Sequence, residues 1–361
     1  MVFIKKIAHN TEEQLRADFG DCPPKPLKAE IANLQFVVVR FGWIGKQLYL
    51  AQDLLFSFLN LCKGSYQGDH QDLLSLQAEI SGAKQDMHDA FAKTSKELGV
   101  FGKFAFIGVW ILLSPFLFLI LLYKSTKLIR VIFRFLSSQR STIGMFNPLS
   151  FSRSHIAIYD PLLKLFSKTG WSTDAVVSHE HVHLLQSHFF PERNLGDFNR
   201  QTTENLKNFL IDPEADLQSC SYFFQLNEME ARLHEVILSY YRERGELPAD
   251  YRSFIGLLLG CGGLGQLLKI QLDNNNIAPN ADVPFDFKAR DKAAVIDIVG
   301  SVLKLKDGKF VLRFIMEALP VMYANLLILY GGADQAKRYL KTVDNIQFYL
   351  DLYGTPPGHL A

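Results

Sequence analysis

The chain has few cysteines and almost no net charge, and both facts limit the kinds of protein to which it can belong. Four cysteines stand far apart in 361 residues and form no CxxC pair: Cys22, Cys62, Cys220 and Cys261. Isolated thiols are typical of proteins in a reducing compartment. The formal net charge is +1, whereas a general nucleic-acid-binding protein carries a basic excess. We therefore expect no nucleic-acid partner, and a reducing, cytoplasmic compartment for most of the chain.

The sequence also lacks internal repeats, low-complexity tracts, long runs of like charge and a strong signal peptide. The apolar stretch after Met1 ends at Lys5, which is too short for a secretory signal. Apolar residues, by contrast, are abundant, because 48% of the chain is hydrophobic and 29 residues are Phe. A chain of this length and composition can form two or three domains with a substantial core.

One apolar run is long enough to cross a membrane. Residues 104–123 contain no charged side chain, and Lys103 and Lys124 bracket them. Twenty helical residues span a hydrocarbon core, and neighbouring groups can compensate for the hydrogen bond lost at Pro115. The alternative is a buried helix, or two short helices broken at Pro115. We predict a single-pass transmembrane helix with membrane lipid as a partner.

The stretch after this run is both basic and apolar. Residues 124–140 alternate Lys and Arg with aliphatic and aromatic side chains, which suits a helix at an interface with anionic lipid headgroups. An ordinary amphipathic helix is the alternative. Basic residues are nearly balanced on the two sides of the apolar run, so the orientation stays open. A shorter apolar stretch at 314–330 includes Glu317 and is more typical of a buried core helix.

The most specific pattern in the chain is an HExxH motif at residues 179–183. On a helix, positions i and i+4 lie on one face, so His179 and His183 can hold one metal ion together. Glu180 can then reach a water molecule on that metal and act as a general base. His181 turns away from the ligand face and is interpreted as a packing residue. Gln186 shares the ligand face and could contact substrate or support a ligand.

The residues around the motif predict a strand followed by a helix. Ser172 or Thr173 can cap the helix, and neither Pro nor Gly interrupts it before Pro191. Upstream, residues 155–161 alternate in polarity and end at Pro161, as a half-buried strand does. We expect this strand to align an extended peptide by pairing along its edge.

A catalytic zinc ion usually takes three protein ligands and leaves one position open, so a third ligand is expected. Residues 227–235 read NEMEARLHE within a second helical pattern that runs to about Tyr241. An HExxH motif followed by a helical Asn-Glu-x-x-Ala segment resembles the gluzincin metallopeptidases. In that family a glutamate on a later helix completes the zinc site, so the resemblance implies Glu228 as the third ligand. It covers residues 156–235, under a quarter of the chain.

The sequence departs from the gluzincin pattern at Arg232, where the family often carries an Asp or Asn that supports a zinc-bound histidine. This departure leaves Glu230 open as an alternative third ligand. Glu228 and Glu230 point to nearly opposite sides of their helix, so only one of them can face the metal. His234 is a further candidate ligand, although a core or surface role is more typical of such a histidine.

An oxyanion donor in such a site is a tyrosine or a histidine. Three tyrosines lie near the second helical pattern, and the sequence does not select among them: Tyr222, Tyr240 and Tyr241. We therefore expect one of them to contact the substrate or the oxyanion.

Three regions are expected along the chain. Residues 1–100 form a helical N-terminal region, with helical patterns near 27–62 and 70–98. Residues 101–140 form a membrane-spanning and interfacial segment, and residues 141–361 a zincin-like metallopeptidase domain. The expected fold class is mainly α with a small antiparallel β-sheet, comprising a zincin-like (gluzincin) core, the helical N-terminal region and one transmembrane helix.

These patterns predict a membrane-associated, zinc-dependent endopeptidase that hydrolyses a protein or peptide substrate, with Zn²⁺ as cofactor and Glu180 as catalytic residue. Two alternatives remain. One is a membrane-bound metal-binding or interaction protein with a structural or inactive HExxH site. The other is a soluble helical protein in which the apolar run belongs to the core.

Overall fold

The computed structural model describes residues 4–20, 34–42, 44–46, 81–82, 85–86, 89, 144–147, 155–161, 163, 172–194, 196–213, 222–282 and 292–355. The chain divides into two compact units, one of Met1–Trp43 with Ile143–Ala361 and one of Ile44–Thr142. The predicted membrane run at 104–123 and the basic stretch after it lie outside the described residues. The fold and the site described below belong to the first unit.

A four-stranded mixed sheet has the order β1-β2-β4-β3. Its strands are β1 (Ile4–Asn10), β2 (Gln35–Phe41), β3 (Gly144–Asn147) and β4 (His155–Tyr159). The β1–β2 and β3–β4 pairs are antiparallel, whereas β2 and β4 run parallel. The expectation of a purely antiparallel sheet is therefore wrong. The parallel pair is feasible because more than a hundred residues separate β2 from β4, and parallel strands need a long crossover connection.

The strand β1 lies in the N-terminal region that was expected to be helical, so that expectation is wrong over Ile4–Asn10. The strand β2 lies where the sequence suggests a helix near residues 27–62, and that prediction is wrong over Gln35–Phe41. Its sequence, QFVVVRF, is rich in β-branched and aromatic residues, which fit a pleated surface better than a helix. The expected use of β4 as a sheet edge also needs correction. Because β4 pairs with both β2 and β3, its own edges are occupied, and β3 is the strand at that end of the sheet.

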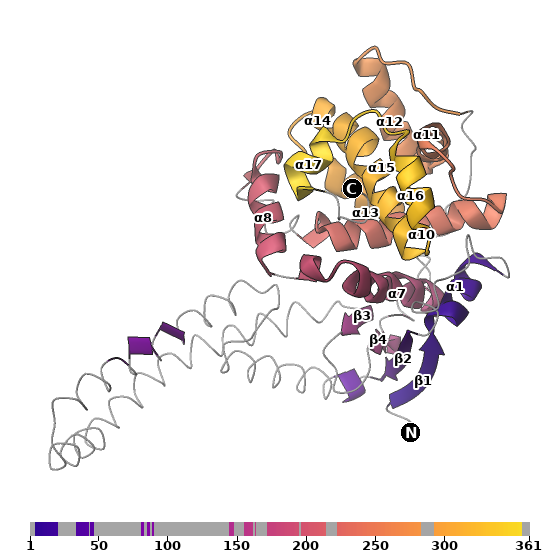
Figure 1. The fold of residues 1–361 in the computed structure, drawn as a ribbon, viewed down its shortest axis with the longest axis vertical. Helices are drawn as coiled ribbons and strands as arrows, with labels where there is room; N and C mark the ends of the chain where they lie inside the picture. Colours follow the sequence, from indigo (N-terminus) through magenta and orange to yellow (C-terminus); the bar gives the residue numbers. More distant parts are fainter. Residues whose placement is uncertain are drawn as a thin grey trace. The chain divides into compact units, whose positions relative to one another are not determined.

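The remaining described elements of this unit are helical. They are α1 (Thr11–Phe19), α7 (Thr173–Phe189), η3 (Pro191–Asn194), α8 (Gly196–Lys207), α10 (Leu226–Arg244), α11 (Tyr251–Gly260), α12 (Gly262–Asn274), α13 (Lys292–Val302), α14 (Gly308–Arg313), η4 (Phe314–Ala318), α15 (Leu319–Leu329), α16 (Ala333–Leu340) and α17 (Gln347–Tyr353). The protein is thus mostly helical with a small mixed sheet, and α7 lies between the sheet and the other helices (Figure 1).

Two hydrophobic clusters hold α7 in this position. In the smaller cluster, sheet residues such as Phe36 and Ile156 pack against Val176 and Leu184 of α7. In the larger cluster, Val182 and Leu185 of α7 join the core formed by α10, α15 and the surrounding helices. Burial on both sides fixes the rotation of α7 about its axis, and with it the direction in which its polar side chains point.

Among the described residues, one helical stretch is long and apolar enough to cross a membrane. It is Gly308–Leu329, which has 22 residues and is 89% buried inside the fold over its most apolar window. Glu317 within it accepts a hydrogen bond from the Phe348 backbone at 2.7 Å and pairs with Arg313. This burial is that of a core helix, so the stretch gives only weak support to the expected membrane association.

Candidate metal centre

The helix α7 begins where the sequence predicts it. Ser172 is the capping residue of the two that were open, because its hydroxyl accepts a hydrogen bond from the Ala175 backbone at 3.1 Å. Asp174 adds a negative charge in the first turn, where the helix dipole favours it. The helix then runs without interruption to Phe189, which places the whole HExxH motif on one regular helix.

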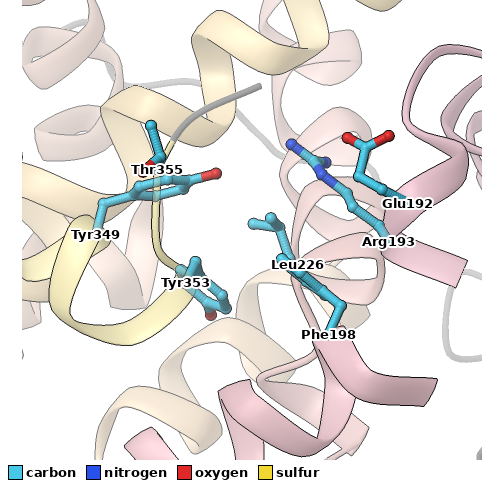
Figure 2. A pocket seen from close by; sticks show the side chains of 7 residues that line it. All are labelled: Glu192, Arg193, Phe198, Leu226, Tyr349, Tyr353 and Thr355. Carbon is cyan, nitrogen blue, oxygen red and sulfur yellow. The ribbon is translucent and has the colours of Figure 1, made fainter. Parts of the chain in front are cut away.

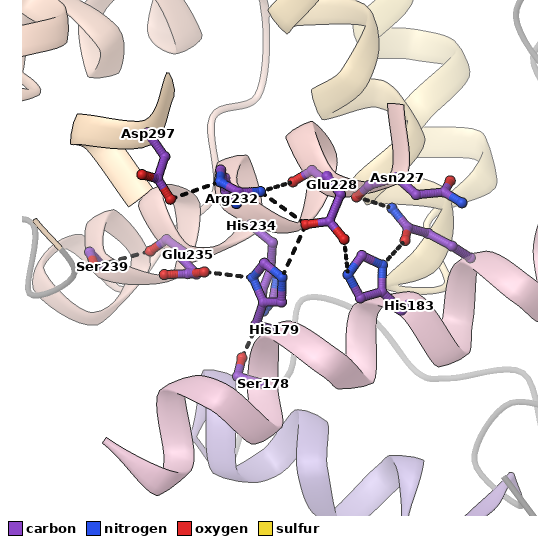
Figure 3. A network of polar contacts seen from close by, with 11 residues as sticks. Ser178, His179, His183, Asn227, Glu228, Arg232, His234, Glu235, Ser239 and Asp297 are labelled. Carbon is purple, nitrogen blue, oxygen red and sulfur yellow. Dashed lines mark hydrogen bonds and ion pairs between the residues drawn. The ribbon is translucent and has the colours of Figure 1, made fainter. Parts of the chain in front are cut away.

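His179 and His183 meet Glu228 of α10 across the contact between the two helices (Figure 3). The Nε2 atom of His179 lies 3.7 Å from Oε2 of Glu228, and the Nε2 atom of His183 lies 3.4 Å from Oε1. One ligand atom from each residue lies within 4.8 Å of the others. This buried group of two imidazoles and one carboxylate could hold a metal ion.

Glu230, the alternative ligand, faces away from the two histidines. It is fully buried and forms an ion pair with Arg193 of η3 at 2.8 Å. It also accepts hydrogen bonds from Asn325 at 2.7 Å and from Gln186 at 3.0 Å. The structure therefore brings Glu228, and not Glu230, to the histidines, as expected for residues two apart on a helix.

Each histidine is held by a partner at its other ring nitrogen. Nδ1 of His179 lies 2.7 Å from Oε1 of Glu235, and Nδ1 of His183 lies 2.8 Å from Oε1 of Gln186. Both partners offer acceptor oxygens, so Nδ1 carries the hydrogen and donates. In a neutral imidazole the lone pair then sits on Nε2, the atom that faces Glu228. The orientation and the tautomer both suit metal binding.

Glu235 is the functional residue that the sequence reasoning missed. It stands seven residues after Glu228, or about two helical turns, so both carboxylates lie on one face of α10. The carboxylate partner of a histidine was expected at position 232, where Arg232 stands instead. Arg232 binds Oε2 of Glu228 at 3.0 Å and Asp297 of α13 at 3.0 Å, and so fixes the Glu228 carboxylate. The i+7 spacing was the available signal.

The charges in this cluster stabilise one another against burial. Burial disfavours the charged form of His179, yet Glu228 and Glu235 together raise its pKa to about 10. Burial likewise opposes ionisation of Glu228, yet His183 and His179 hold its pKa well below the usual range. The Glu228 carboxylate thus favours positive charge at the two imidazoles. A divalent cation bound there would supply that positive charge in place of protons.

Glu180 and Tyr222 lie beside the cluster. Glu180 is buried, and its charge acts on both His183 and Tyr222, which shows that it is close to them. Tyr222 is 48% exposed, and the negative charge of the neighbouring Glu228 acts on its hydroxyl. Burial and the neighbouring Glu228 raise the pKa of Tyr222 well above its ordinary value, so its hydroxyl keeps its proton.

The other two tyrosines are placed elsewhere. Tyr240 is buried in the large helical core, where it lies close to Tyr323. Tyr241 packs edge-on against Phe19 of α1, with ring centroids 5.1 Å apart. Of the three tyrosines that the sequence left open, the structure thus brings Tyr222 to the histidines and glutamates.

His181 and His234 are buried beside the cluster without joining it. His181 contacts the Thr11 hydroxyl at 3.2 Å, and burial lowers its pKa to about 3. His234 lies 2.9 Å from the Ser178 hydroxyl and 2.6 Å from the Tyr330 hydroxyl, and burial lowers its pKa to about 3 as well. Both rings are therefore neutral and engaged in other contacts, and His181 is the packing residue that the sequence indicates.

Replacing Glu235 by glutamine should weaken the binding of a metal ion about tenfold, because the partner of a metal-bound histidine sets its basicity and orientation. The amide oxygen can still accept the hydrogen bond, but the negative charge beside His179 is lost. Competition with a chromophoric chelator measures the affinity. Glu243→Gln, an exposed position on the same helix, is the matched control. Equal affinity of both variants would contradict the role of Glu235.

Asp18, a buried carboxyl group on α1, should make stability depend on pH. Burial raises its pKa to about 7, against a hydrogen bond from Gln14 at 3.0 Å that lowers it. A raised folded-state pKa means that this contribution to stability is complete below pH 3.8 and is lost as the pH rises through about 7. Between pH 5.5 and 8 the chain should lose about 2 kcal/mol more unfolding free energy than Asp18→Asn. Urea unfolding at both pH values measures this, and parallel curves would refute it.

No protein-family model, curated protein or solved structure matches this chain. The function is therefore inferred from the side chains that the structure brings together. The strongest observation is the His179, His183 and Glu228 cluster, with a partner on each histidine.

Proposed function

We propose that the protein is a zinc-dependent endopeptidase of gluzincin type, associated with a membrane through residues 101–140. One observation carries the proposal: the Nε2 atoms of His179 and His183 both face the Glu228 carboxylate, at 3.7 and 3.4 Å. Two imidazoles and one carboxylate form a ligand set of catalytic zinc sites. The two nitrogen ligands favour zinc over magnesium and calcium, which prefer oxygen ligands.

The side chains around this ligand set would supply the roles that peptide hydrolysis requires. Bound zinc would lower the pKa of a water molecule and polarise the peptide carbonyl. Glu180 would take a proton from that water on a carboxylate oxygen and deliver it to the nitrogen of the leaving amine. Tyr222, whose hydroxyl keeps its proton, would donate a hydrogen bond to the oxygen that becomes negative.

One further feature supports a peptide as the substrate, and another supports the ligand set. The strand β3 is the last strand of the sheet beside β4 and contacts α7, so an extended peptide pairing with β3 would pass the metal-binding helix. Arg232 binds both Asp297 and Oε2 of Glu228. It thereby holds the Glu228 carboxylate in place and leaves the other carboxylate oxygen, Oε1, without a bond to Arg232. These groups would keep the ligand geometry constant during the reaction.

Metal analysis combined with a cleavage assay tests the proposal. The purified full-length protein should contain about one zinc per chain, cleave an unstructured protein such as casein, lose this activity with a chelator and regain it with added zinc. A metal-binding protein with an inactive site would hold the zinc yet cleave no tested substrate. Failure to bind zinc at all would reject the metal centre itself.

A further inference from the structure

A cavity of about 250 Å³ lies beside the first turn of α10 (Figure 2). Leu226 lines it, and Leu226 and Glu230 are four residues apart, so they share one face of the helix. Glu228 is about 160° around the helix from either residue, given 3.6 residues per turn. The cavity and the metal cluster therefore lie on opposite faces of α10, and the mechanism proposed above does not use the cavity.

The polar side of the cavity carries an unused hydrogen-bond donor. Arg193 is 2% exposed, and its Nη1 atom binds both oxygens of Glu230 at 3.0 and 2.8 Å. Its guanidinium stacks on Phe190 at 4.0 Å. The Nη2 atom is buried and has no hydrogen-bond partner among the described residues. Buried polar groups normally have a partner, so this nitrogen indicates a missing acceptor.

A second donor faces Arg193 across the cavity. The hydroxyl of Tyr349 points toward the guanidinium in Figure 2. This hydroxyl accepts a hydrogen bond from Nδ2 of Asn325 at 3.3 Å, so its own hydrogen remains available to donate. Two donors that converge on one space suit a group with two acceptor oxygens, as in a carboxylate.

We propose that this cavity binds a small molecule with one carboxylate on an apolar body. The carboxylate accepts hydrogen bonds from Nη2 of Arg193 and from the Tyr349 hydroxyl. The body packs against the apolar wall formed by Phe198, Leu226 and Tyr353. A cavity of about 150 Å³ holds a benzene molecule, so the larger volume here accommodates a phenyl ring with a short acid side chain.

The charges around the cavity favour a carboxylate over a phosphate. Glu230 already neutralises Arg193, and Glu192 carries a further negative charge at the wall. A dianionic phosphate would meet both carboxylates, whereas a monoanion replaces only the missing acceptor. Glu192 lies beside Arg193 in Figure 2 and could also receive an ammonium group, which would distinguish an amino acid from a simple organic acid.

Hydrogen bonds connect this cavity to the metal cluster, and this part of the inference rests on the proposed function. Arg193 binds Glu230, Glu230 accepts from Gln186 at 3.0 Å, and Gln186 holds Nδ1 of His183 at 2.8 Å. A ligand that shares the Arg193 guanidinium changes how firmly Glu230 holds Gln186. Occupancy of the cavity and metal binding therefore alter each other by the same factor.

Calorimetric titration of the full-length, chelator-treated protein tests the cavity without relying on catalysis. The probes are 3-phenylpropionate, 3-phenylpropionamide, L-phenylalanine and inorganic phosphate. The carboxylate should bind at least tenfold more tightly than the amide and than phosphate. L-Phenylalanine binding more tightly than 3-phenylpropionate would identify an amino acid as the ligand class, and weaker binding an organic acid. Absence of carboxylate binding, or equal binding of the amide or of phosphate, would overturn the proposal.

Two variants assign the binding to this cavity. Arg193→Lys retains a positive charge for Glu230 but has no second nitrogen, and Tyr349→Phe removes the facing hydroxyl. Each should weaken 3-phenylpropionate binding about tenfold while circular dichroism stays unchanged. Arg338→Lys makes the same exchange at an exposed position on α16 and should bind as the unmodified chain does. Unchanged affinity in a folded Arg193→Lys or Tyr349→Phe variant would place any binding elsewhere.

A cobalt titration tests the connection to the metal. The affinity for Co²⁺, followed by its visible absorption, should change about fivefold when 3-phenylpropionate is present at saturation. If the carboxylate binds and the cobalt affinity stays constant, the hydrogen-bonded link is wrong. If cobalt does not bind under any condition, the metal centre is wrong, while the result for the cavity still stands.

Discussion

Glu180→Gln is expected to lower kcat/KM for peptide hydrolysis at least about 100-fold, because general acid–base catalysis contributes 10²–10⁴-fold. The amide that replaces the carboxylate is nearly the same size, but it cannot take a proton from water or return one to the leaving amine. Glu180 is not one of the three residues that face one another as ligands, so bound zinc should stay near one per chain. Steady-state cleavage and metal analysis on the same preparation measure both quantities.

The control for this variant is Glu204→Gln, at an exposed position on α8. It removes one negative charge from the surface and should change neither zinc content nor cleavage. Continued proteolysis by a zinc-loaded Glu180→Gln variant would show that the catalytic assignment is wrong. Loss of zinc together with activity would show instead that Glu180 contributes to the metal site.

Glu228→Ala is expected to remove most of the bound zinc, with a loss in affinity greater than the 10–100-fold that follows the removal of a ligand's supporting partner. Only two imidazoles would remain as ligands, because the described cluster contains no second carboxylate that faces both Nε2 atoms. Zinc per chain after dialysis, followed by chelator competition, measures the effect.

Glu230→Gln provides the contrast to Glu228→Ala. It should retain zinc, because Glu230 lies on the far face of α10 and pairs with Arg193. It should lower the unfolding free energy by about 3–5 kcal/mol, since breaking a buried ion pair leaves an uncompensated charge. The opposite pattern, with zinc lost in Glu230→Gln and kept in Glu228→Ala, would exchange the roles of the two glutamates.

Much of the candidate site could be predicted because the HExxH spacing is a local property of a single helix. The spacing of His179 and His183 places both on one helical face, whatever the rest of the fold does. The capping role of Ser172 depends only on the next three residues. The choice between Glu228 and Glu230 needed the structure, because α10 presents one or the other according to how it rotates against α7.

The partners of the site were harder to predict because they depend on contacts between distant segments. Glu235 and Gln186 face the histidines only after α7 and α10 have packed together. The sheet was predicted as antiparallel throughout and without β1 and β2. The parallel pairing of β2 with β4 could not be predicted because it is set by tertiary structure rather than by local propensity. The burial of the helical stretch Gly308–Leu329 was indicated correctly by Glu317 within an apolar run.

The parallel pairing of β2 with β4 has a consequence for how the protein is made. Val38 pairs with Ile156, so the early strand must wait for more than a hundred further residues to be translated, or on the order of 5–20 s at ribosomal speeds. During this interval one edge of β2, with its valines, is unpaired. Unpaired strand edges promote aggregation or chaperone binding. The sheet that packs against the HExxH helix is thus completed late. A nascent chain stalled before residue 155 would contain β1 and β2 but not β4.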